Sequence, residues 1–461
     1  GTNEDFKDFV SKCHQMGVKV IFDGVFNHTG REFLAFKDVK ANRENSRYRD
    51  WYLDVNFWGN NEYNDGFSYQ NWGGHNLLVK LNVRNPEVKN YLFDSVRFWV
   101  SEFNIDGIRL DAADVLDQDF MSELRGITDT LKPEFWLMGE VIHGDYSKWA
   151  NGNRLHSVTN YDLHKGLYSG HNDHNYFEIA HTIKRINGNV GNTRLYIFAD
   201  NHDVERIYTK LNNKAHMFDI TLLLYTVYGI PSIYYGSEFC IEGRKENGSD
   251  WGLRPYLDLN NFKDAIKNNE ITRLITRLGQ LKKDFKELTY GDYKELALTN
   301  RQFAFARTLN GSAVITVLNN DDGPAHMEIN LPVAANTAVD LLLQSEEEIV
   351  TNEVVEDNKI NEEAIEAANQ VTNQLVTLEK LVLDIKAKAS VGEEIREDVV
   401  YSQEVLSKVQ VSMGNLLDSV KIQPTTAPIV INENSQVEIR DGRLIVDVPA
   451  NRGMLIYVTM R

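Results

Sequence analysis

Cysteine is scarce in this sequence, and long apolar runs are absent. Cys13 and Cys240 are its two cysteines among 461 residues, too few for a disulfide framework or a metal site built on thiolates. No apolar run reaches the roughly 20 residues that a membrane-spanning helix requires. The sequence opens with Gly1 and shows no signal-peptide pattern. We therefore expect a globular protein without disulfide bridges; its compartment stays open, with the cytoplasm favoured.

The sequence has fewer basic residues than acidic ones. The chain has 49 Lys and Arg against 67 Asp and Glu, which gives a formal net charge of −18. Such a surface repels phosphate backbones and anionic lipid, so we expect neither nucleic acid nor a membrane as a partner. The hydrophobic fraction of 42% is enough for a sizeable core. A chain of 461 residues is too long for one ordinary domain, so we expect two or three.

The first two-thirds of the sequence alternate short β-rich runs with amphipathic helical stretches, which is typical of α/β proteins. Most of these runs are apolar almost throughout, as expected of parallel strands that are buried on both faces. They are VKVIFDGVF (18–26), IDGIRLD (105–111), FWLMGEV (135–141), HSVTNYDL (156–163), RLYIFAD (194–200) and PSIYYG (231–236). The pattern predicts six parallel strands with helices between them.

Two further regions depart from this alternation. Residues 29–80 are rich in Asn and aromatic residues and too long for a plain loop, so we interpret them as a small inserted lobe. From about Gln302 the pattern changes to short alternating strands, which predicts an antiparallel sandwich.

A third region, residues 346–420, differs in composition from its surroundings. It is rich in Glu, Asn, Gln and Val, contains no proline, and has Tyr401 as its one aromatic residue. Apolar residues recur at three- and four-residue steps on both sides of Gly392, which predicts a helical hairpin. The hairpin is either a spacer packed on itself or a surface for partner binding or dimerisation.

Acidic residues follow several of the predicted strands, namely Asp23, Asp111, Glu140 and Asp203. The carboxyl ends of parallel barrel strands converge on one face, so we expect these side chains to lie close together. One acidic residue at a strand end is usually a helix cap, but four on separate strands indicate a site. Paired carboxylates suit glycoside hydrolysis, because one attacks or stabilises a cationic sugar while the other protonates the leaving oxygen.

The strings around these residues resemble a known family. DGVFNH (23–28), GIRLDAAD (107–114), GEV (139–141) and ADNHD (199–203) resemble, in order, the four signature regions of the α-amylase family of glycoside hydrolases. LVKLN (78–82) resembles an additional region of the neopullulanase, cyclomaltodextrinase and maltogenic amylase branch. GIPSIYYGSE (229–238) and DWGLRP (250–255) resemble the last barrel strand and its following loop. The resemblance covers roughly residues 1–345 and 425–461 and leaves out the helical hairpin.

The resemblance implies roles for individual residues. Asp111 matches the family's nucleophile, Glu140 its general acid/base, and Asp203 the carboxylate that stabilises the transition state. The implied reaction is hydrolysis of α-1,4-glucosidic bonds by double displacement with retention, on maltodextrins, cyclodextrins or starch, with transfer to sugar acceptors left open. Aromatic residues of the lobe are candidates for stacking on glucose rings, although we expect half or more to form the core of the lobe.

The remaining candidate residues surround these three. Arg109 lies two residues before Asp111 on the same strand, so both side chains point the same way and its positive charge would keep Asp111 ionised. His28 and His202 match histidines that hydrogen-bond sugar hydroxyls, and Asp23 matches a supporting residue. Calcium is common in the family, and Asn27 matches one of its ligand positions, although Val115 stands where a ligating histidine often sits. We expect no organic cofactor.

The resemblance also implies a fold. It is a (β/α)8-type barrel, of which only the third to eighth strands are recognisable here, and it gives four parts. We expect a catalytic barrel at 1–28 and 81–295 that is incomplete at its N-terminus, the lobe at 29–80, a C-terminal sandwich at 296–345 and 421–461, and the hairpin at 346–420. Either a longer polypeptide or another chain supplies the missing strands, or the structure departs from that of the family.

Two other functions remain open alongside the leading one. The chain could serve as a carbohydrate-binding or regulatory subunit with an incomplete barrel, or as an assembly module built on the hairpin. Its partners would then include further copies of itself in a homo-oligomer. The presence of Asp111, Glu140 and Asp203 together favours the hydrolase, because a pure binding protein has no need of all three.

Overall fold

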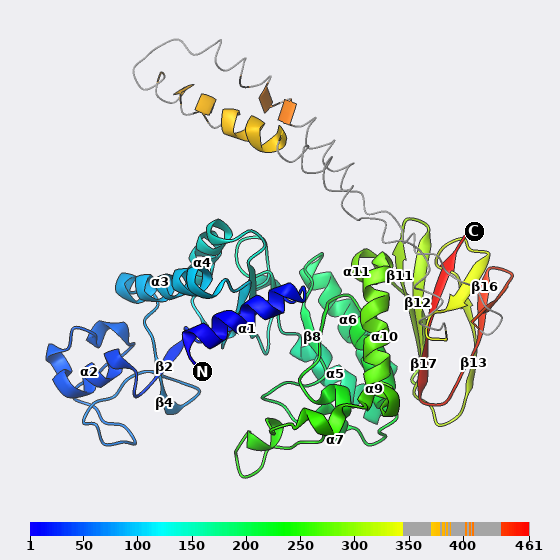
Figure 1. Cartoon of the computed structure of the whole chain (residues 1–461), viewed down its shortest axis with the longest axis horizontal. Coiled ribbons are helices and arrows are strands. Elements are labelled where there is room, and N and C mark those ends of the chain that lie inside the picture. The colour runs from blue at the N-terminus through cyan, green and yellow to red at the C-terminus, as the bar shows by residue number, and fades with distance from the viewer. Residues whose placement is uncertain are drawn as a thin grey trace.

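The computed structural model of the chain describes residues 1–343 and 435–460 (Figure 1). Between these ranges it describes a small number of residues, all of them helical: 370–378, 380–382, 384, 385, 388, 402, 405, 406, 408 and 409. The rest of the predicted hairpin at 346–420 lies outside the described residues, so the hairpin stays a prediction.

Short parallel strands form the centre of the first two-thirds of the chain. Four of them make a sheet in the order β1-β5-β6-β7, and β8 pairs with β9. A parallel bridge between Thr159 and Tyr196 links the end of β7 to the start of β8. Their bounds are β1 (Ile21–Gly24), β5 (Gly107–Leu110), β6 (Trp136–Gly139), β7 (Ser157–Val158), β8 (Tyr196–Phe198) and β9 (Ile230–Ser232). All six predicted strands are confirmed, and each is shorter than the apolar run that predicted it.

One of these runs changes structure partway. The segment 156–163 forms a strand only as far as Val158, and α5 begins at Tyr161. The side chain of Asn160 accepts a hydrogen bond from the N–H of Leu163, which is the contact of a helix N-cap. The cap therefore places Tyr161 at the start of a helix, beside the carboxyl ends of the strands.

Helices connect the parallel strands and cover them (Figure 1). Their bounds are α1 (Asn3–Gln15), α3 (Pro86–Phe103), α4 (Gln118–Leu131), α5 (Tyr161–Asn172), α6 (Tyr176–Val190), α7 (Ile207–Lys210), α8 (His216–Thr226), α9 (Ala265–Asn268), α10 (Glu270–Asp284) and α11 (Lys286–Tyr290). In α3, Asn85 caps the helix, Pro86 takes its first position, and Val88, Leu92 and Val96 are buried. None of the described helices combines the length and apolar character needed to cross a membrane.

The buried aromatic side chains of the inserted lobe belong to a hydrophobic core that continues into the first parallel strands. The lobe contains α2 (Leu34–Asn42) and the antiparallel strands β2 (His28–Gly30), β3 (Asn71–Trp72) and β4 (His75–Lys80). Phe36 packs against the rings of Tyr52, Phe67 and Tyr69. Of the aromatic residues considered for stacking, Trp51 and Tyr69 are buried, Trp72 is partly buried, and Trp58 and Tyr63 are exposed.

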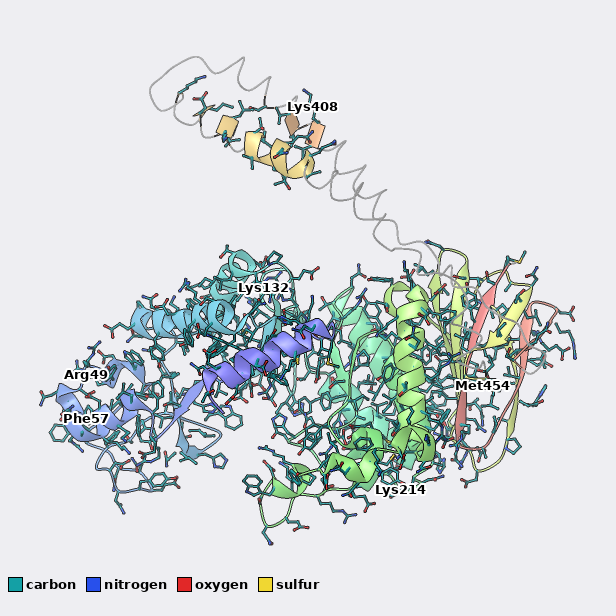
Figure 2. All side chains as sticks on the ribbon, viewed as in Figure 1. Arg49, Phe57, Lys132, Lys214, Lys408 and Met454 are labelled. Atoms are coloured by element: carbon teal, nitrogen blue, oxygen red, sulfur yellow. The ribbon has the colours of Figure 1, made fainter. Side chains whose placement is uncertain are left out.

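Two antiparallel sheets follow the parallel strands and lie at the opposite end of the molecule from the lobe (Figure 2). The larger has the order β10-β11-β12-β17-β14, and the smaller β13-β16-β15. Their bounds are β10 (Asp292–Leu298), β11 (Gln302–Leu309), β12 (Ser312–Asn319), β13 (Ala325–Asn330), β14 (Thr337–Asp340), β15 (Glu438–Arg440), β16 (Arg443–Val448) and β17 (Arg452–Thr459). Strand β17 pairs with β12 and β14, so residues on both sides of the 346–420 segment complete one sheet.

The larger sheet is apolar on both faces. One face, which includes Ile315 and Val458, packs with Val446 of the smaller sheet. The other face, which includes Phe303 and Leu455, packs with apolar side chains of α8 and α10. These contacts attach the antiparallel sheets to the parallel part of the chain.

Gly107 begins β5, which lies between β1 and β6, and its surroundings are crowded. It pairs with Ile21 of β1 and Trp136 of β6, and a Cβ atom there would lie 2.3 Å from the carbonyl oxygen of Trp136. We expect Gly107→Ala to separate these strands and to lower stability by about 1–3 kcal/mol, the usual cost of overpacking. The midpoint of denaturant unfolding followed by circular dichroism measures this.

A matched glycine provides the control for this substitution. Gly126 lies in α4, and a Cβ there meets no atom within 4 Å. Gly126→Ala should raise stability by about 0.5–1 kcal/mol, because alanine loses less backbone entropy in a helix. Equal unfolding midpoints for the two variants would contradict the close approach at Gly107.

Candidate active site

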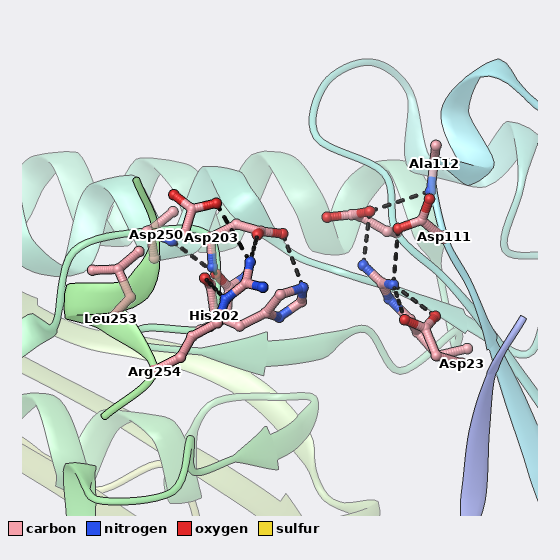
Figure 3. A network of polar contacts seen from close by, with 12 residues as sticks. Asp23, Asp111, Ala112, His202, Asp203, Asp250, Leu253 and Arg254 are labelled. Atoms are coloured by element: carbon pink, nitrogen blue, oxygen red, sulfur yellow. Dashed lines mark hydrogen bonds and ion pairs between the residues drawn. The ribbon is translucent and has the colours of Figure 1, made fainter. Parts of the chain in front are cut away.

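The predicted carboxylates converge at the carboxyl ends of the parallel strands. Asp23 lies in β1, Asp111 directly follows β5, and Glu140 directly follows β6. Asp203 lies on the loop after β8. Figure 3 shows two groups of polar contacts, one that includes Asp23 and Asp111 and one that includes His202, Asp203 and Arg254.

The guanidinium of Arg109 is the centre of the first group. Its Nη1 lies 2.7 Å from Asp23 and 3.1 Å from Asp111, and its Nη2 lies 2.8 Å from Glu140. Asp23 and Arg109 are direct partners in the β1–β5 register, which brings the arginine to the neighbouring strand. Burial lowers the pKa of Arg109, but the charges of the carboxylates outweigh it and raise the pKa overall. A permanently positive charge thus neutralises part of the negative charge of three strand ends.

Glu140 is the most buried of these carboxyls, with 9% of its surface exposed. Its Oε2 accepts a hydrogen bond from the N–H of Ala112 (3.2 Å) and its Oε1 one from the hydroxyl of Tyr161 (3.3 Å). Burial raises the pKa of Glu140, and the charges of Asp111 and Asp203 add to this rise, against the opposing charge of Arg109. Glu140 therefore keeps its proton to a higher pH than an ordinary glutamate.

The backbone beside Asp111 is unusual. Ala112 has φ +47°, in the left-handed region that residues with a side chain rarely adopt. This conformation accompanies the hydrogen bond that the Ala112 N–H donates to Glu140. Strained backbone of this kind is concentrated at functional sites.

Asp203 has a different environment. His202 Nε2 lies 3.0 Å from its Oδ2, and Arg254 Nη2 lies 3.0 Å from its Oδ1. Burial raises the pKa of Asp203, but the hydrogen bond with His202 and the charges of His202 and Arg254 outweigh it, so the pKa is lowered overall. The carboxylate is therefore ionised at neutral pH.

Two side chains that the sequence analysis missed connect these groups. The amide of Asn201 donates to the hydroxyl of Tyr161 (3.0 Å), which donates in turn to Glu140. The carbonyl oxygen of the same amide accepts a hydrogen bond from the N–H of Asp203 (2.9 Å). The side chains of Glu140 and Asn201, which come from the segments after β6 and β8, are thus linked through Tyr161, the first residue of α5.

Arg254 is a third missed residue, although its motif was noticed in the sequence. Besides Asp203, it pairs with Asp250 at 3.4 Å and donates through Nε to the carbonyl oxygen of His202 (3.1 Å). The only signal available in the sequence was the Arg-Pro pair in DWGLRP (250–255), to which no role had been given.

His28 lies at the boundary between the lobe and the parallel strands. Its ring stacks on Trp72 at a centroid distance of 5.9 Å, and its Nδ1 is 3.2 Å from the amide nitrogen of Asn27. Burial lowers the pKa of His28; the charge of Asp111 acts against this and that of Lys80 adds to it. The imidazole is therefore neutral at neutral pH.

The surroundings of Asn27 do not fit the calcium ion that the family resemblance suggested. Its amide oxygen accepts a hydrogen bond from Lys80 Nζ (2.5 Å), and the same ammonium contacts the carbonyl oxygen of Val115 (3.1 Å). These two oxygens are therefore already bound to a cationic side chain. In the part of the chain that the structure describes, no three His, Cys, Asp or Glu side chains are grouped so as to hold a metal ion.

The opposite pKa shifts of Glu140 and Asp203 predict opposite effects of neutral substitutions on stability. The pKa of Glu140 is raised above its ordinary 4.5, so the stability that its neutral form contributes is lost as the pH rises through the folded-state pKa. Glu140→Gln, which is neutral at every pH, should melt at a higher temperature than wild type above about pH 4.5. The difference should grow with pH until the folded-state pKa is passed.

Asp203→Asn supplies the matched comparison. The pKa of Asp203 is lowered from 3.8, so its ionised form contributes stability that is present above that value and is lost as the pH falls through the folded-state pKa. The variant should melt below wild type at neutral pH, and the difference should vanish in acid. Melting curves of the three proteins from about pH 3 to pH 9 measure both effects. If both variants shifted the melting temperature in the same direction at neutral pH, the opposite pKa shifts of Glu140 and Asp203 would be contradicted.

The chain is similar to several known proteins. A sequence model described as alpha amylase, catalytic domain, matches residues 1–284. A cyclomaltodextrinase of Thermoanaerobacter pseudethanolicus is 32% identical over 331 residues, which are 69% of this chain and 55% of that protein. Neopullulanase 2 of Thermoactinomyces vulgaris is 32% identical over 324 residues, which are 68% of this chain and 54% of that protein. The chain therefore spans about half the length of these curated relatives.

A solved structure shows the same fold. The crystal structure of a debranching enzyme from Nostoc punctiforme is similar with a TM-score of 0.63 and 29% sequence identity, and the match covers 72% of each chain. The parallel strands and helices have a TIM-barrel fold, and a C-terminal β-sheet domain follows them. Since the family match covers more than half of the residues and includes Asp111, Glu140 and Asp203, the chain belongs to the alpha-amylase family of glycoside hydrolases.

Proposed function

We propose that this chain is a retaining α-glucan hydrolase that cleaves α-1,4-glucosidic bonds of maltodextrins, cyclodextrins or starch. The single observation that carries the proposal is the contact of one guanidinium, that of Arg109, with both Asp111 and Glu140. The two terminal nitrogens of a guanidinium lie side by side, so the carboxyls that bind them are close together. Retaining glycosidases hold their two carboxyls ~5–5.5 Å apart, whereas inverting enzymes need a wider gap for a water molecule.

The environments of the carboxyls support their division into roles. Glu140, with its raised pKa, is the general acid that protonates the leaving oxygen and later the base that activates water. Asp111 attacks the anomeric carbon and forms a covalent glycosyl intermediate. Asp203, ionised and held by His202 and Arg254, stabilises the positive charge that develops on the sugar.

Other residues bind and orient the substrate in this proposal. His28 and His202 hydrogen-bond sugar hydroxyls, while Arg109 and Asp23 hold Asp111 in place. Such fixed positioning lowers the barrier by converting a bimolecular encounter into an oriented one. The relatives named cyclomaltodextrinase and neopullulanase support short α-glucans and cyclodextrins as the substrate class.

Substitution of the two reacting carboxyls tests the proposal. We expect Asp111→Asn and Glu140→Gln to lower the hydrolysis of maltoheptaose and β-cyclodextrin at least about a thousandfold, because each removes a group that acts on the reacting bond. Product release followed by chromatography measures the rates, and circular dichroism verifies folding. Asp129→Asn is the matched control, because Asp129 is a half-exposed residue of α4 that pairs with Arg125.

The same assay decides between the hydrolase and a binding subunit. Binding of maltoheptaose by wild type without turnover would favour the binding subunit, and near-full activity of either variant would overturn the assignment of roles. The first product observed by proton NMR should have the α configuration. An initial β product would contradict retention.

We further propose that the six parallel strands are the third to eighth of an eight-stranded barrel, and that a further segment or another chain supplies two more. Among the described residues β1 pairs only with β5, and β9 only with β8. Ile21 and Val25, at the β1 edge, are exposed despite being apolar. Unpaired edges of this kind favour pairing with another strand.

Formation of a homo-oligomer also stays a prediction.

Amide hydrogen exchange along β1 tests this completion of the barrel. The β1 N–H groups that do not bond to β5 should exchange rapidly in this chain alone. They should become protected when a polypeptide carrying the two additional strands is present, because the new strand accepts their hydrogen bonds. Protection in this chain alone would contradict a free edge.

A further inference from the structure

Lys80 lies where the lobe meets the parallel strands. It is the last residue of β4 and is paired in register with His28 of β2. Its ammonium contacts two uncharged oxygens, the amide oxygen of Asn27 (2.5 Å) and the backbone oxygen of Val115 (3.1 Å). Val115 belongs to the segment that follows Asp111, so one ammonium bridges the lobe and the segment behind the proposed nucleophile.

This contact determines the orientation of the Asn27 amide. An ammonium has three donors and no acceptor, so the atom of Asn27 that it binds must be the oxygen. The other end of the amide is therefore the nitrogen, and this atom lies 3.2 Å from Nδ1 of His28. Asn27 is 1% exposed, so the amide is held within the fold and has little access to water.

The orientation of Asn27 in turn determines which nitrogen of His28 carries a proton. An amide nitrogen can only donate, so Nδ1 of His28 must accept. A neutral imidazole that accepts at Nδ1 carries its proton on Nε2. Trp72, which stacks on the ring, limits its rotation and so prevents the two nitrogens from exchanging places.

We propose that Lys80 and Asn27 are positioning residues that hold His28 in the Nε2–H tautomer, so that Nε2 is the nitrogen available to donate a hydrogen bond to a sugar hydroxyl. The inference about the tautomer stands on the Lys80–Asn27–His28 contacts alone. Its consequence for substrate binding rests on the proposed function, so the two parts are tested by different measurements.

The tautomer is measured directly by NMR. Long-range proton–nitrogen correlation spectra of the imidazole nitrogens distinguish the Nε2–H, Nδ1–H and doubly protonated forms, and a His28→Gln spectrum identifies the His28 signals among those of the 12 histidines. We expect the Nε2–H pattern in wild type at neutral pH. An Nδ1–H pattern there would overturn the proposal regardless of any activity.

Asn27→Asp is the decisive variant. The aspartate retains an acceptor for Lys80, and therefore the contact between lobe and barrel, but a carboxylate accepts and cannot donate to His28. We expect a proton on Nδ1 in this variant, with no loss in melting temperature. An Nε2–H pattern retained in Asn27→Asp would show that Asn27 does not determine the tautomer of His28 and would overturn the proposal.

Substitutions of Lys80 test whether its ammonium orients the amide of Asn27. Lys80→Met removes the donors that orient the amide, so His28 should populate both tautomers. Lys80→Arg, which also donates without accepting, should keep the Nε2–H form. Lys37→Met is the matched control, because Lys37 is an exposed lysine of α2 in the same lobe. Unchanged His28 signals in Lys80→Met would contradict the role of the ammonium.

The kinetic consequence separates positioning from a merely structural role. Loss of one hydrogen bond to substrate should raise KM about tenfold in Asn27→Asp and Lys80→Met, with a smaller change in kcat. If Lys80 acted only by attaching the lobe, Asn27→Asp would leave KM unchanged. A wild-type chain that shows the Nε2–H tautomer but no hydrolysis, even with a polypeptide that carries the two additional strands, would leave the tautomer proposal intact and overturn the proposed function instead.

Discussion

The Arg109 guanidinium is the contact on which the site depends. It binds Asp23, Asp111 and Glu140, which come from three adjacent strands and would otherwise repel one another. The strands can come this close because Gly107, two residues earlier on β5, leaves space for the carbonyl oxygen of Trp136 and the side chain of Ile21. Because Gly107 has no side chain, the three strands can lie this close together. The positive charge of Arg109 then stabilises the carboxylates that the strands carry.

Around this contact, burial and neighbouring charges make chemically similar carboxyls behave differently. Glu140 is more deeply buried than Asp203, and its pKa is raised. Asp203 is held by a histidine and an arginine, and its pKa is lowered. Tyr161 and Asn201 connect the two, so the donor to Glu140 is itself oriented by the segment that carries Asp203. The pKa values of Glu140 and Asp203 therefore differ because of their environments, since both side chains are carboxyls.

Much of this arrangement could be predicted before the structure was known, and the exceptions have physical causes. The strands were identified because parallel strands buried on both faces need continuous apolar runs. Strand β10 lies before Gln302, where the antiparallel strands were expected to begin, because its side chains are mostly half-exposed and give no alternating apolar pattern. Tyr161 falls within the β-rich segment 156–163, which predicted a strand, whereas the Asn160 cap starts a helix there. The motifs located Asp111, Glu140 and Asp203, but not the contact with Arg254 that helps to lower the pKa of Asp203.

The sequence by itself determined the order of apolar runs, the carboxylates that follow them, and the motifs shared with the alpha-amylase family. These features are local, because a strand or a motif depends on neighbouring residues. The tertiary structure alone decided the roles of Arg254, Asn201 and Lys80, whose partners lie far along the chain. Lys80 shows the difference most clearly. Its motif resembles one of the neopullulanase branch, but only the packing of β4 against Asn27 and Val115 shows which oxygens its ammonium binds. Hydrogen-bond direction and burial depend on which atoms meet in space, and a sequence pattern does not contain that information.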